Sequence, residues 1–405
     1  MKSSAKSLVV LYLLAIVVIH AAVFWKVREM VRKGYSDFAI YYCAGTIFRE
    51  GLGHQLYDDS TQFRVQQEFA PDVPIRRGPL PYSHPPFEGL FFAPFSYLSY
   101  QHAFILWSLL NLAMLAALPF LLRPYLPRLG TYSPALWLLA SLAFFPILFT
   151  FIQGQDAILL LFLYAMAFVS LKKDKQVLAG VWLALGLYKF HLVLPFVLLL
   201  LVMKKFRVLY GFIPVALILA ASSIAVVGPR EILSYPRYVL HLENTMARGA
   251  IVPADNTNLR GLLYVLLPSG RYMTPLVLVL SAGLLAFAAW KLRTAEFSFE
   301  IKFALATITS VLVSYHAMGY DLSMLLLAVF LTADRLLGSE IGGRATSLTQ
   351  IAIAALFFSP AYMVLLFHYN QLAFMGLAVL LLFAGLATVS TTRRKEPRVE
   401  RASVA

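Results

Sequence analysis

Apolar runs long enough to cross a lipid bilayer recur along most of this chain of 405 residues. A transmembrane helix needs about 20 mainly apolar residues, and runs of this kind predict an all-α polytopic membrane protein with about 12 transmembrane helices. Inside a bilayer, every backbone amide and carbonyl must find its partner within the protein, which favours helices over irregular structure. The predicted spans lie near residues 7–26, 103–122, 134–150, 156–171, 176–188, 190–203, 207–227, 272–291, 299–314, 320–336, 349–367 and 370–390.

The basic residues between these runs set the predicted orientation. Most of the 34 lysine and arginine residues fall in loops on the same side as the N-terminus. Short loops rich in lysine and arginine mark the cytoplasmic face, so both termini are expected in the cytoplasm. We treat residues 1–405 as a single integral membrane domain. Two long segments, 27–102 and 228–271, are then extracytoplasmic, and residues 391–405 form a basic cytoplasmic tail.

Two stretches do not fit a simple span. Pro85–Leu98 is apolar but has only about 14 residues, which is below the spanning length. A full crossing there would place the basic loops outside, so we expect an interfacial or re-entrant helix. The spans 176–188 and 190–203 are also short. Because broken helices at membrane depth occur where the backbone is buried in protein or lines a wet cavity, their junction is a candidate cavity wall.

Composition excludes some other classes of protein. The formal net charge of +14 could indicate a nucleic-acid partner, but the basic residues flank apolar runs and form no patch, so none is expected. The single cysteine, Cys43, excludes an internal disulfide framework and is expected to be a packed residue. The run Leu8–Trp25 follows two lysines and lacks a small-residue cleavage site, which indicates an uncleaved signal anchor.

The polar residues that can carry chemistry converge on the extracytoplasmic side. Asp37 follows the first span, and it can either cap a short helix or act as a general base towards a sugar hydroxyl. Tyr41 can stack on a sugar or sit in the interfacial aromatic belt. Tyr82 and His84 belong to a proline-rich loop, where His84 can contact substrate or serve a structural role.

Further candidates lie in four other outer segments. Gln155 and Asp156 join two apolar spans, either as an ordinary turn or as polar groups that face the same compartment as Asp37. Lys189 is costly at membrane depth, and it suits either the phosphate of a lipid-linked substrate or a snorkelling anchor. The remaining candidates are His191 beside it, Asn256, Asn258 and Arg260 in the second outer segment, and His316 and Asp321 between two late spans.

These residues together resemble a known family, the glycosyltransferases of family 87 in the GT-C superfamily. These bacterial enzymes are similar to polyprenol-phosphate-mannose-dependent α-mannosyltransferases. The resemblance covers nearly the whole chain and is carried by Ser36-Asp37-Phe38, Tyr82 with Pro85-Pro86, Gly154-Gln155, Ala179-Gly180, Lys189, Asn256, Asn258-Leu259-Arg260-Gly261, and Ser314 with His316, Tyr320 and Asp321. Asp156 stands where the family often has asparagine, and the family also contains pentose transferases.

The resemblance implies a GT-C fold in the bacterial cytoplasmic membrane, with amphipathic helices in the first outer loop and Asp37 as the catalytic base. It also implies a polyprenyl-phosphate sugar donor, a hexose such as mannose, and a lipid or glycan acceptor outside the cytoplasm. Lys189, Arg260 and His316 are expected to bind the donor phosphate. No nucleotide-binding or metal motif is present in the sequence, and we expect no cofactor. The alternatives are a transporter or a flippase for lipid-linked sugars, and a structural scaffold. The expected substrate-binding residues are Tyr41, Tyr82, His84, Gln155, Asp156, His191, Asn256, Asn258 and Asp321.

Overall fold

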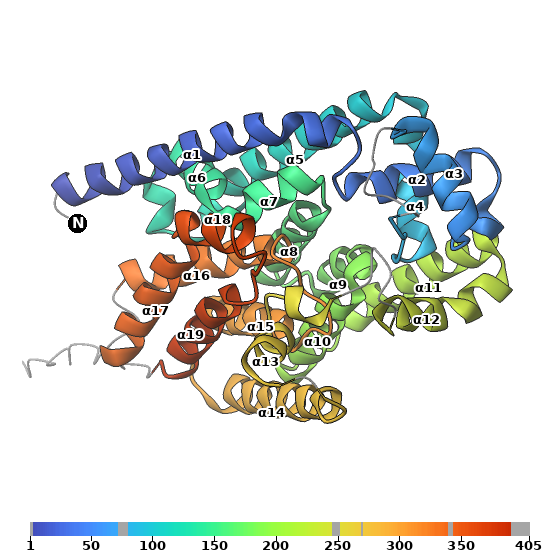
Figure 1. Ribbon diagram of the computed structural model, residues 1–405. Coiled ribbons are helices and arrows are strands. Elements are labelled where there is room, and N and C mark those ends of the chain that lie inside the picture. The colour runs from blue at the N-terminus through green and yellow to red at the C-terminus, as the bar shows by residue number, and fades with distance from the viewer. Residues whose placement is uncertain (1–2, 72–79, 245–251, 269, 339–342, 390–405) are drawn as a thin grey trace, which may run out of the picture.

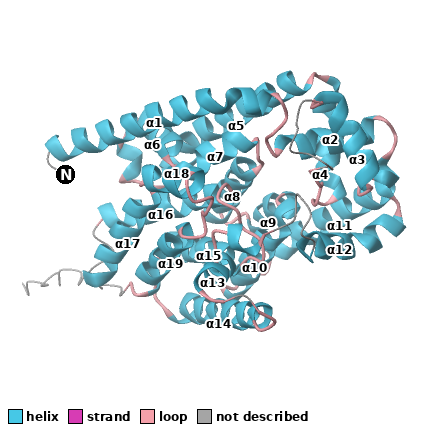
Figure 2. Ribbon diagram, in the orientation of Figure 1, coloured by secondary structure: helices cyan, strands magenta, loops and turns pink. Residues whose placement is uncertain are grey.

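The computed structural model describes residues 3–71, 80–244, 252–268, 270–338 and 343–389, and the predicted tail at 391–405 lies outside these ranges. Within the described ranges the chain is entirely helical and contains no strand (Figure 2). The first half contains α1 (Ser3–Arg32), α2 (Phe38–Arg49), α3 (Asp59–Phe69), α4 (Pro86–Phe92), α5 (Tyr100–Leu122), α6 (Pro134–Ala143), α7 (Phe145–Gln153), α8 (Ala157–Lys172), α9 (Gln176–Leu185) and α10 (Phe190–Val202). The second half contains α11 (Val208–Val227), α12 (Pro229–Asn244), α13 (Leu259–Leu266), α14 (Met273–Thr294), α15 (Phe299–Val313), α16 (Leu325–Leu337), α17 (Gly343–Leu356), α18 (Ser359–Phe367) and α19 (Met375–Ala387). Short 3-10 helices lie at η1 (Gly53–Gln55), η2 (Ala93–Tyr97), η3 (Arg123–Tyr125), η4 (Leu129–Thr131), η5 (Leu187–Lys189), η6 (Pro253–Asp255) and η7 (Asp321–Met324).

Four helices, α1, α5, α11 and α14, are long and apolar enough to cross a membrane, and three bent helix pairs raise the candidate spans among the described residues to 7. Large apolar side chains are exposed along these four helices, among them Leu11, Leu109, Leu217 and Val279. An exposed apolar surface of this extent suits contact with lipid. These helices identify a multi-pass membrane protein.

The centre of the molecule consists of shorter apolar helices. α8 and α15 have only 16 and 15 residues, and most of their side chains are buried. Figure 1 shows them in the middle of the molecule, with α1 running along the top and α14 at the bottom. A helix that is apolar on all sides is typical of a protein interior, so these helices form the core that holds the outer loops in place.

Several predicted spans are broken helices. The span predicted at 134–150 is divided into α6 and α7, which meet at 71°. The break lies at Phe144, and Pro146, just after it, has no N–H to donate to the carbonyl of Leu142. Two side chains from distant helices bond the carbonyls left at the break: His20 Nδ1 lies 2.8 Å from the oxygen of Leu142, and Ser359 Oγ donates to Ala143 at 3.1 Å.

The helices α9 and α10, which the sequence predicted as two short spans, form a second bent pair. They meet at 65° through η5 and reach spanning length only together. The predicted span 349–367 is likewise divided into α17 and α18, bent by 50°. The stretch Pro85–Leu98 forms α4, of 7 residues, followed by η2, of 5 residues. Neither is long enough to cross a bilayer, in agreement with the expectation from its sequence.

Two glycines, Gly180 on α9 and Gly211 on α11, allow these two helices to pack closely. A Cβ atom on Gly180 would lie 1.9 Å from the carbonyl oxygen of Val208. We expect Gly180→Ala to destabilise the protein by about 1–3 kcal/mol, since backbone must move to admit the methyl group. Thermal unfolding in detergent measures this loss. Gly283→Ala on α14 is the matched control because its Cβ would meet nothing within 4 Å, and an unchanged midpoint for Gly180→Ala would contradict the prediction.

Candidate active site

Asp37 precedes α2, but its carboxylate does not cap that helix. The side chain instead faces the turn between α7 and α8, where Gln155 Nε2 donates to Asp37 Oδ2 at 2.8 Å. The backbone N–H of Asp37 donates to Gln153 Oε1 at 3.1 Å. Gln153 and Gln155 are 116 and 118 residues away from Asp37 in sequence. Together they fix its carboxylate in position. Of the two interpretations of Asp37, the structure thus does not support the helix cap.

The orientation of Gln155 is set in turn by Tyr41. The Tyr41 hydroxyl donates to Gln155 Oε1 at 2.6 Å, which leaves the amide nitrogen to face Asp37. Tyr41 is fully buried and stacks on Phe92 with ring centroids 4.7 Å apart, so its contribution is to hold Gln155. Gly154 makes the close approach possible: its φ is +61°, and a Cβ there would lie 2.7 Å from the Cβ of Phe38.

A buried ion cluster lies beside this group. Lys189, in η5, places its ammonium nitrogen 2.9 Å from Asp156 Oδ1 and 2.8 Å from Asp321 Oδ1. All three side chains are at most 3% exposed. The cluster therefore joins three helix starts, at α10, α8 and η7. The sequence placed these residues on one side of the membrane, and the structure brings them into direct contact.

A third acid, Glu88 on α4, completes this cluster beside Asp156 and was not among the residues expected from the sequence. Glu88 Oε2 lies 2.7 Å from His84 Nδ1, and the Glu88 side chain is only 3% exposed. The one signal in the sequence was a lone carboxylate inside an apolar stretch, and its partner Asp156 is distant along the chain. Tyr82, another expected site residue, is buried and donates its hydroxyl to the carbonyl of Pro85 at 2.9 Å, which supports the loop that carries His84.

Burial controls protonation in this cluster. It lowers the pKa of His84 to about 4, so that the imidazole is neutral at pH 7. Burial also raises the pKa of Glu88 to about 7. For Asp156, burial raises the pKa to about 8, although Lys189 opposes the rise. Two buried carboxyl groups this close resist ionising together unless more positive charge compensates them.

The two outer asparagines are occupied by backbone contacts. Asn256 Oδ1 accepts from the N–H of Ala317 at 2.7 Å. Asn258 donates to the carbonyl of Ser314 at 2.5 Å and accepts from the N–H of Gly261 at 3.2 Å, which caps α13. These bonds fasten the start of α13 to the loop after α15, and both side chains are fully buried.

The same loop brings Arg260 and two histidines together. The Arg260 guanidinium donates to the carbonyl of Tyr315 at 2.9 Å and lies 3.9 Å from the centre of its ring. The rings of His191 and His316 meet edge to face at 5.8 Å. His191 Nε2 and His316 Nδ1 are buried and have no hydrogen-bond partner among the described residues. This group and the Lys189 cluster supply positive charge and ring nitrogens near Asp321.

His316 predicts a pH dependence of stability. Burial lowers its pKa to about 4; Asp321 opposes this, while Lys189, Arg260 and His84 add to it. An unfolded histidine titrates near pH 6.5. Between about pH 6.5 and pH 4 the unfolded chain binds a proton that folded His316 does not, so stability falls as the pH is lowered through this window.

Thermal unfolding in detergent across that window tests the effect. We expect His316→Asn to flatten the dependence of the unfolding midpoint on pH, because the buried imidazole is gone. His54→Asn, which removes an exposed imidazole, should keep the wild-type slope. Equal slopes for wild type and His316→Asn would show that His316 does not contribute.

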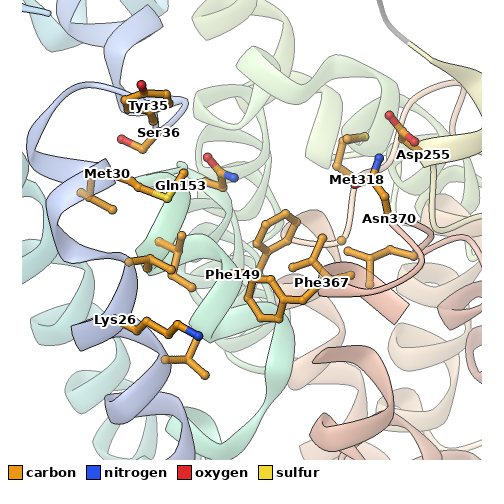
Figure 3. A pocket seen from close by; sticks show the side chains of 17 residues that line it. Lys26, Met30, Tyr35, Ser36, Phe149, Gln153, Asp255, Met318, Phe367 and Asn370 are labelled. Carbon is orange, nitrogen blue, oxygen red and sulfur yellow. The ribbon is translucent and has the colours of Figure 1, made fainter. Parts of the chain in front are cut away.

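An open cavity of about 780 Å³ reaches the neighbours of Asp37, although Asp37 itself does not line it. Its wall is mostly apolar and comes from α1, α7, α18 and the loop between α15 and η7 (Figure 3). Ser36 and Gln153, the immediate neighbours of Asp37 in sequence and in space, belong to this wall. Figure 3 shows Phe149 and Phe367 in the middle of the cavity and Lys26 below on α1. The cavity therefore offers an apolar volume that ends beside a fixed carboxylate.

Comparison with known proteins gives one match. Residues 82–314 match the family model described as Glycosyltransferase family 87, which is more than half of the chain. No curated protein and no solved structure matches. The matched residues include His84, Glu88, Asp156 and Lys189 and begin after Asp37.

Proposed function

The chain belongs to glycosyltransferase family 87, and we propose that it transfers a hexose such as mannose from a polyprenyl-phosphate sugar to a lipid or glycan acceptor. A membrane glycosyltransferase is the activity that the family and the membrane helices imply. The proposal adds the donor, the acceptor class, the bacterial cytoplasmic membrane and an active site on the extracytoplasmic face. It also adds a GT-C arrangement of twelve spans. These are α1, α5, α11 and α14, the bent pairs α6–α7 and α17–α18, and each of α8, α9, α10, α15, α16 and α19.

One observation supports this proposal above all: Ser36 and Gln153, which adjoin the fixed carboxylate of Asp37, line an apolar cavity. Asp37 lies outside the residues matched by the family, so its assignment rests on this geometry and on the sequence resemblance. The wall of apolar side chains from α1, α7 and α18 suits an isoprenoid chain, because ligand pockets of several hundred Å³ are lined mainly by apolar groups. A water-soluble nucleotide donor would gain little from such a wall.

In the proposed reaction Asp37 takes the proton of an acceptor hydroxyl as its oxygen attacks the anomeric carbon of the sugar. The bond between that carbon and the phosphate oxygen breaks, and the polyprenyl phosphate leaves with the electron pair. Arg260 and His316 are proposed to stabilise the charge on the leaving phosphate. Lys189 contributes from within its ion cluster, where two carboxylates already share its charge.

The remaining residues are proposed to support the reaction, some of them next to the substrate and others by positioning other residues. Gln155 and Tyr41 position Asp37 through the hydrogen bonds described above. His191 and Asp321 lie next to the proposed phosphate site. Tyr82, Asn256 and Asn258 shape it by holding its loops, and His84 and Asp156 form its buried floor.

The test is a transfer assay on purified protein with a panel of polyprenyl-phosphate sugars and the corresponding nucleotide sugars. Transfer is expected only from the polyprenyl-phosphate donors. A cavity variant, Val27→Trp, should raise the donor KM because the indole fills the apolar wall. Val9→Trp, on the same helix at a site 49% exposed and away from the cavity, is its control. Transfer from nucleotide sugars, or an unchanged KM for Val27→Trp, would overturn the proposal for the donor.

A further inference from the structure

The proposed transfer assigns no role to the contact between Glu88 and Asp156. A second inference follows from this contact. We propose that His84, Glu88 and Asp156 bind one divalent transition-metal ion. Each residue offers one ligand atom, and the three atoms all lie within 4.8 Å of one another. Metal–nitrogen and metal–oxygen bonds of about 2.0–2.2 Å separate ligand atoms by about 3–4.4 Å, so small side-chain movements bring the three onto one ion.

The formal charge of the buried cluster supports a dication. Lys189 is the one cation in direct contact with it among the described residues, and it faces Asp156 and Asp321. With Glu88 the cluster holds three carboxylates against one ammonium group, a formal excess of two negative charges. Buried charges persist when they are paired or coordinate metals. One divalent ion would cancel the excess and allow all three acids to ionise.

Oxygen atoms without donors provide an independent observation. Glu88 Oε1 and Asp156 Oδ2 are buried and accept no hydrogen bond from any other described residue, so that only a proton shared between the two carboxyl groups can serve them. Glu88 is 3% exposed and Asp156 is 1% exposed. A buried acceptor without a donor is unfavourable, and these two belong to neighbouring carboxylates that repel each other once that proton is lost. A metal ion between them removes both costs.

The surroundings hold the three ligands in place. His84 and Glu88 are four residues apart, at the start of α4, and Asp156 immediately precedes α8. The Tyr57 hydroxyl donates to the carbonyl of His84 at 2.9 Å, and the ring of Tyr41 lies edge-on to the imidazole at 5.2 Å. Partners behind metal ligands orient them, so this support favours a site formed before the ion arrives.

The donor set also defines the class of ion. One imidazole nitrogen and two carboxylates suit Zn²⁺ or Mn²⁺, whereas Mg²⁺ and Ca²⁺ prefer oxygen ligands only. Three protein ligands leave at least one coordination position open. Lys189 already occupies Asp156 Oδ1, so the ion is assigned to the opposite oxygen, Oδ2. The ion would thereby connect α4 to α8 and fix Asp156 against Lys189.

Mn²⁺ binding to the whole protein tests this inference. Protein purified in detergent is treated with a chelator, dialysed and titrated with Mn²⁺ while the electron paramagnetic resonance signal of free Mn²⁺ is recorded. One Mn²⁺ per chain is expected, displaced by Zn²⁺, with a nitrogen hyperfine coupling from His84 in the spin-echo spectrum. Glu88→Gln should weaken binding at least about 10-fold, and His84→Asn should remove the nitrogen coupling.

Glu68→Gln, on α3 with a side chain 53% exposed, is the matched control and should bind like wild type. No bound Mn²⁺ at millimolar concentration, or equal affinity in wild type and Glu88→Gln, would overturn the site and leave a carboxyl pair that shares a proton. If Glu88→Gln does not fold, the nitrogen coupling in wild-type protein decides alone. The proton transfer proposed for Asp37 does not pass through this ion, so either proposal can fail without the other.

Discussion

Replacement of Asp37 by asparagine is expected to lower the rate of glycosyl transfer by about 100- to 10,000-fold, the usual contribution of a general base. The amide has the same shape as the carboxylate and can still accept the hydrogen bond from Gln155, so the site stays assembled. It cannot take a proton from the acceptor. The loss should therefore appear in kcat, while the donor KM changes little because the cavity wall is intact.

The measurement is a steady-state assay of purified wild-type and variant protein with the same polyprenyl-phosphate donor. Asp59→Asn is the control, since Asp59 is an exposed acid of the same outer segment and lies at the start of α3. Both variants should unfold at the wild-type temperature. A kcat for Asp37→Asn within a few-fold of wild type would remove Asp37 from the role of base.

Replacement of Lys189 by methionine is expected to destabilise the protein by about 3–5 kcal/mol, which is typical when one partner of a buried ion pair is removed. Methionine fills a similar volume but leaves the carboxylates of Asp156 and Asp321 without their cation. Both acids are at most 1% exposed, so water does not replace the lost charge. The unfolding midpoint in detergent should fall accordingly.

A second substitution separates this effect from a loss of packing. Asp321→Asn in the Lys189→Met background removes one of the uncompensated charges and should recover part of the lost stability. Lys173→Met, at an exposed site after α8, is the control. A Lys189→Met variant that loses activity at wild-type stability would show that Lys189 serves the donor phosphate alone.

The sequence predicted the parts of this molecule that depend on local pattern. Apolar runs became helices, and the polar turns at Asp37, Gln155, Lys189 and Asp321 came together. This was predictable because loops at the same end of a helical bundle lie close together. The predicted order of the spans was enough to place Asp37 and Gln155 at the same end of the bundle.

Other features depend on contacts that no local pattern contains. The separation of α6 from α7 follows from Pro146, but its 71° bend needs partners on α1 and α18. Glu88 lies in an apolar stretch whose sequence gives no hint of Asp156. The two outer asparagines looked available for substrate, and only the structure shows that backbone groups of the neighbouring loop occupy them.

The broken helix α6–α7 has a consequence for how the protein is made. Its two open carbonyls are bonded by His20, which is synthesised 122 residues before Leu142, and by Ser359, which is synthesised 216 residues after Ala143. One of these two carbonyls therefore lacks its partner until Ser359 has been translated. The bend is thus completed during synthesis by α18, a helix translated well after the break that it closes.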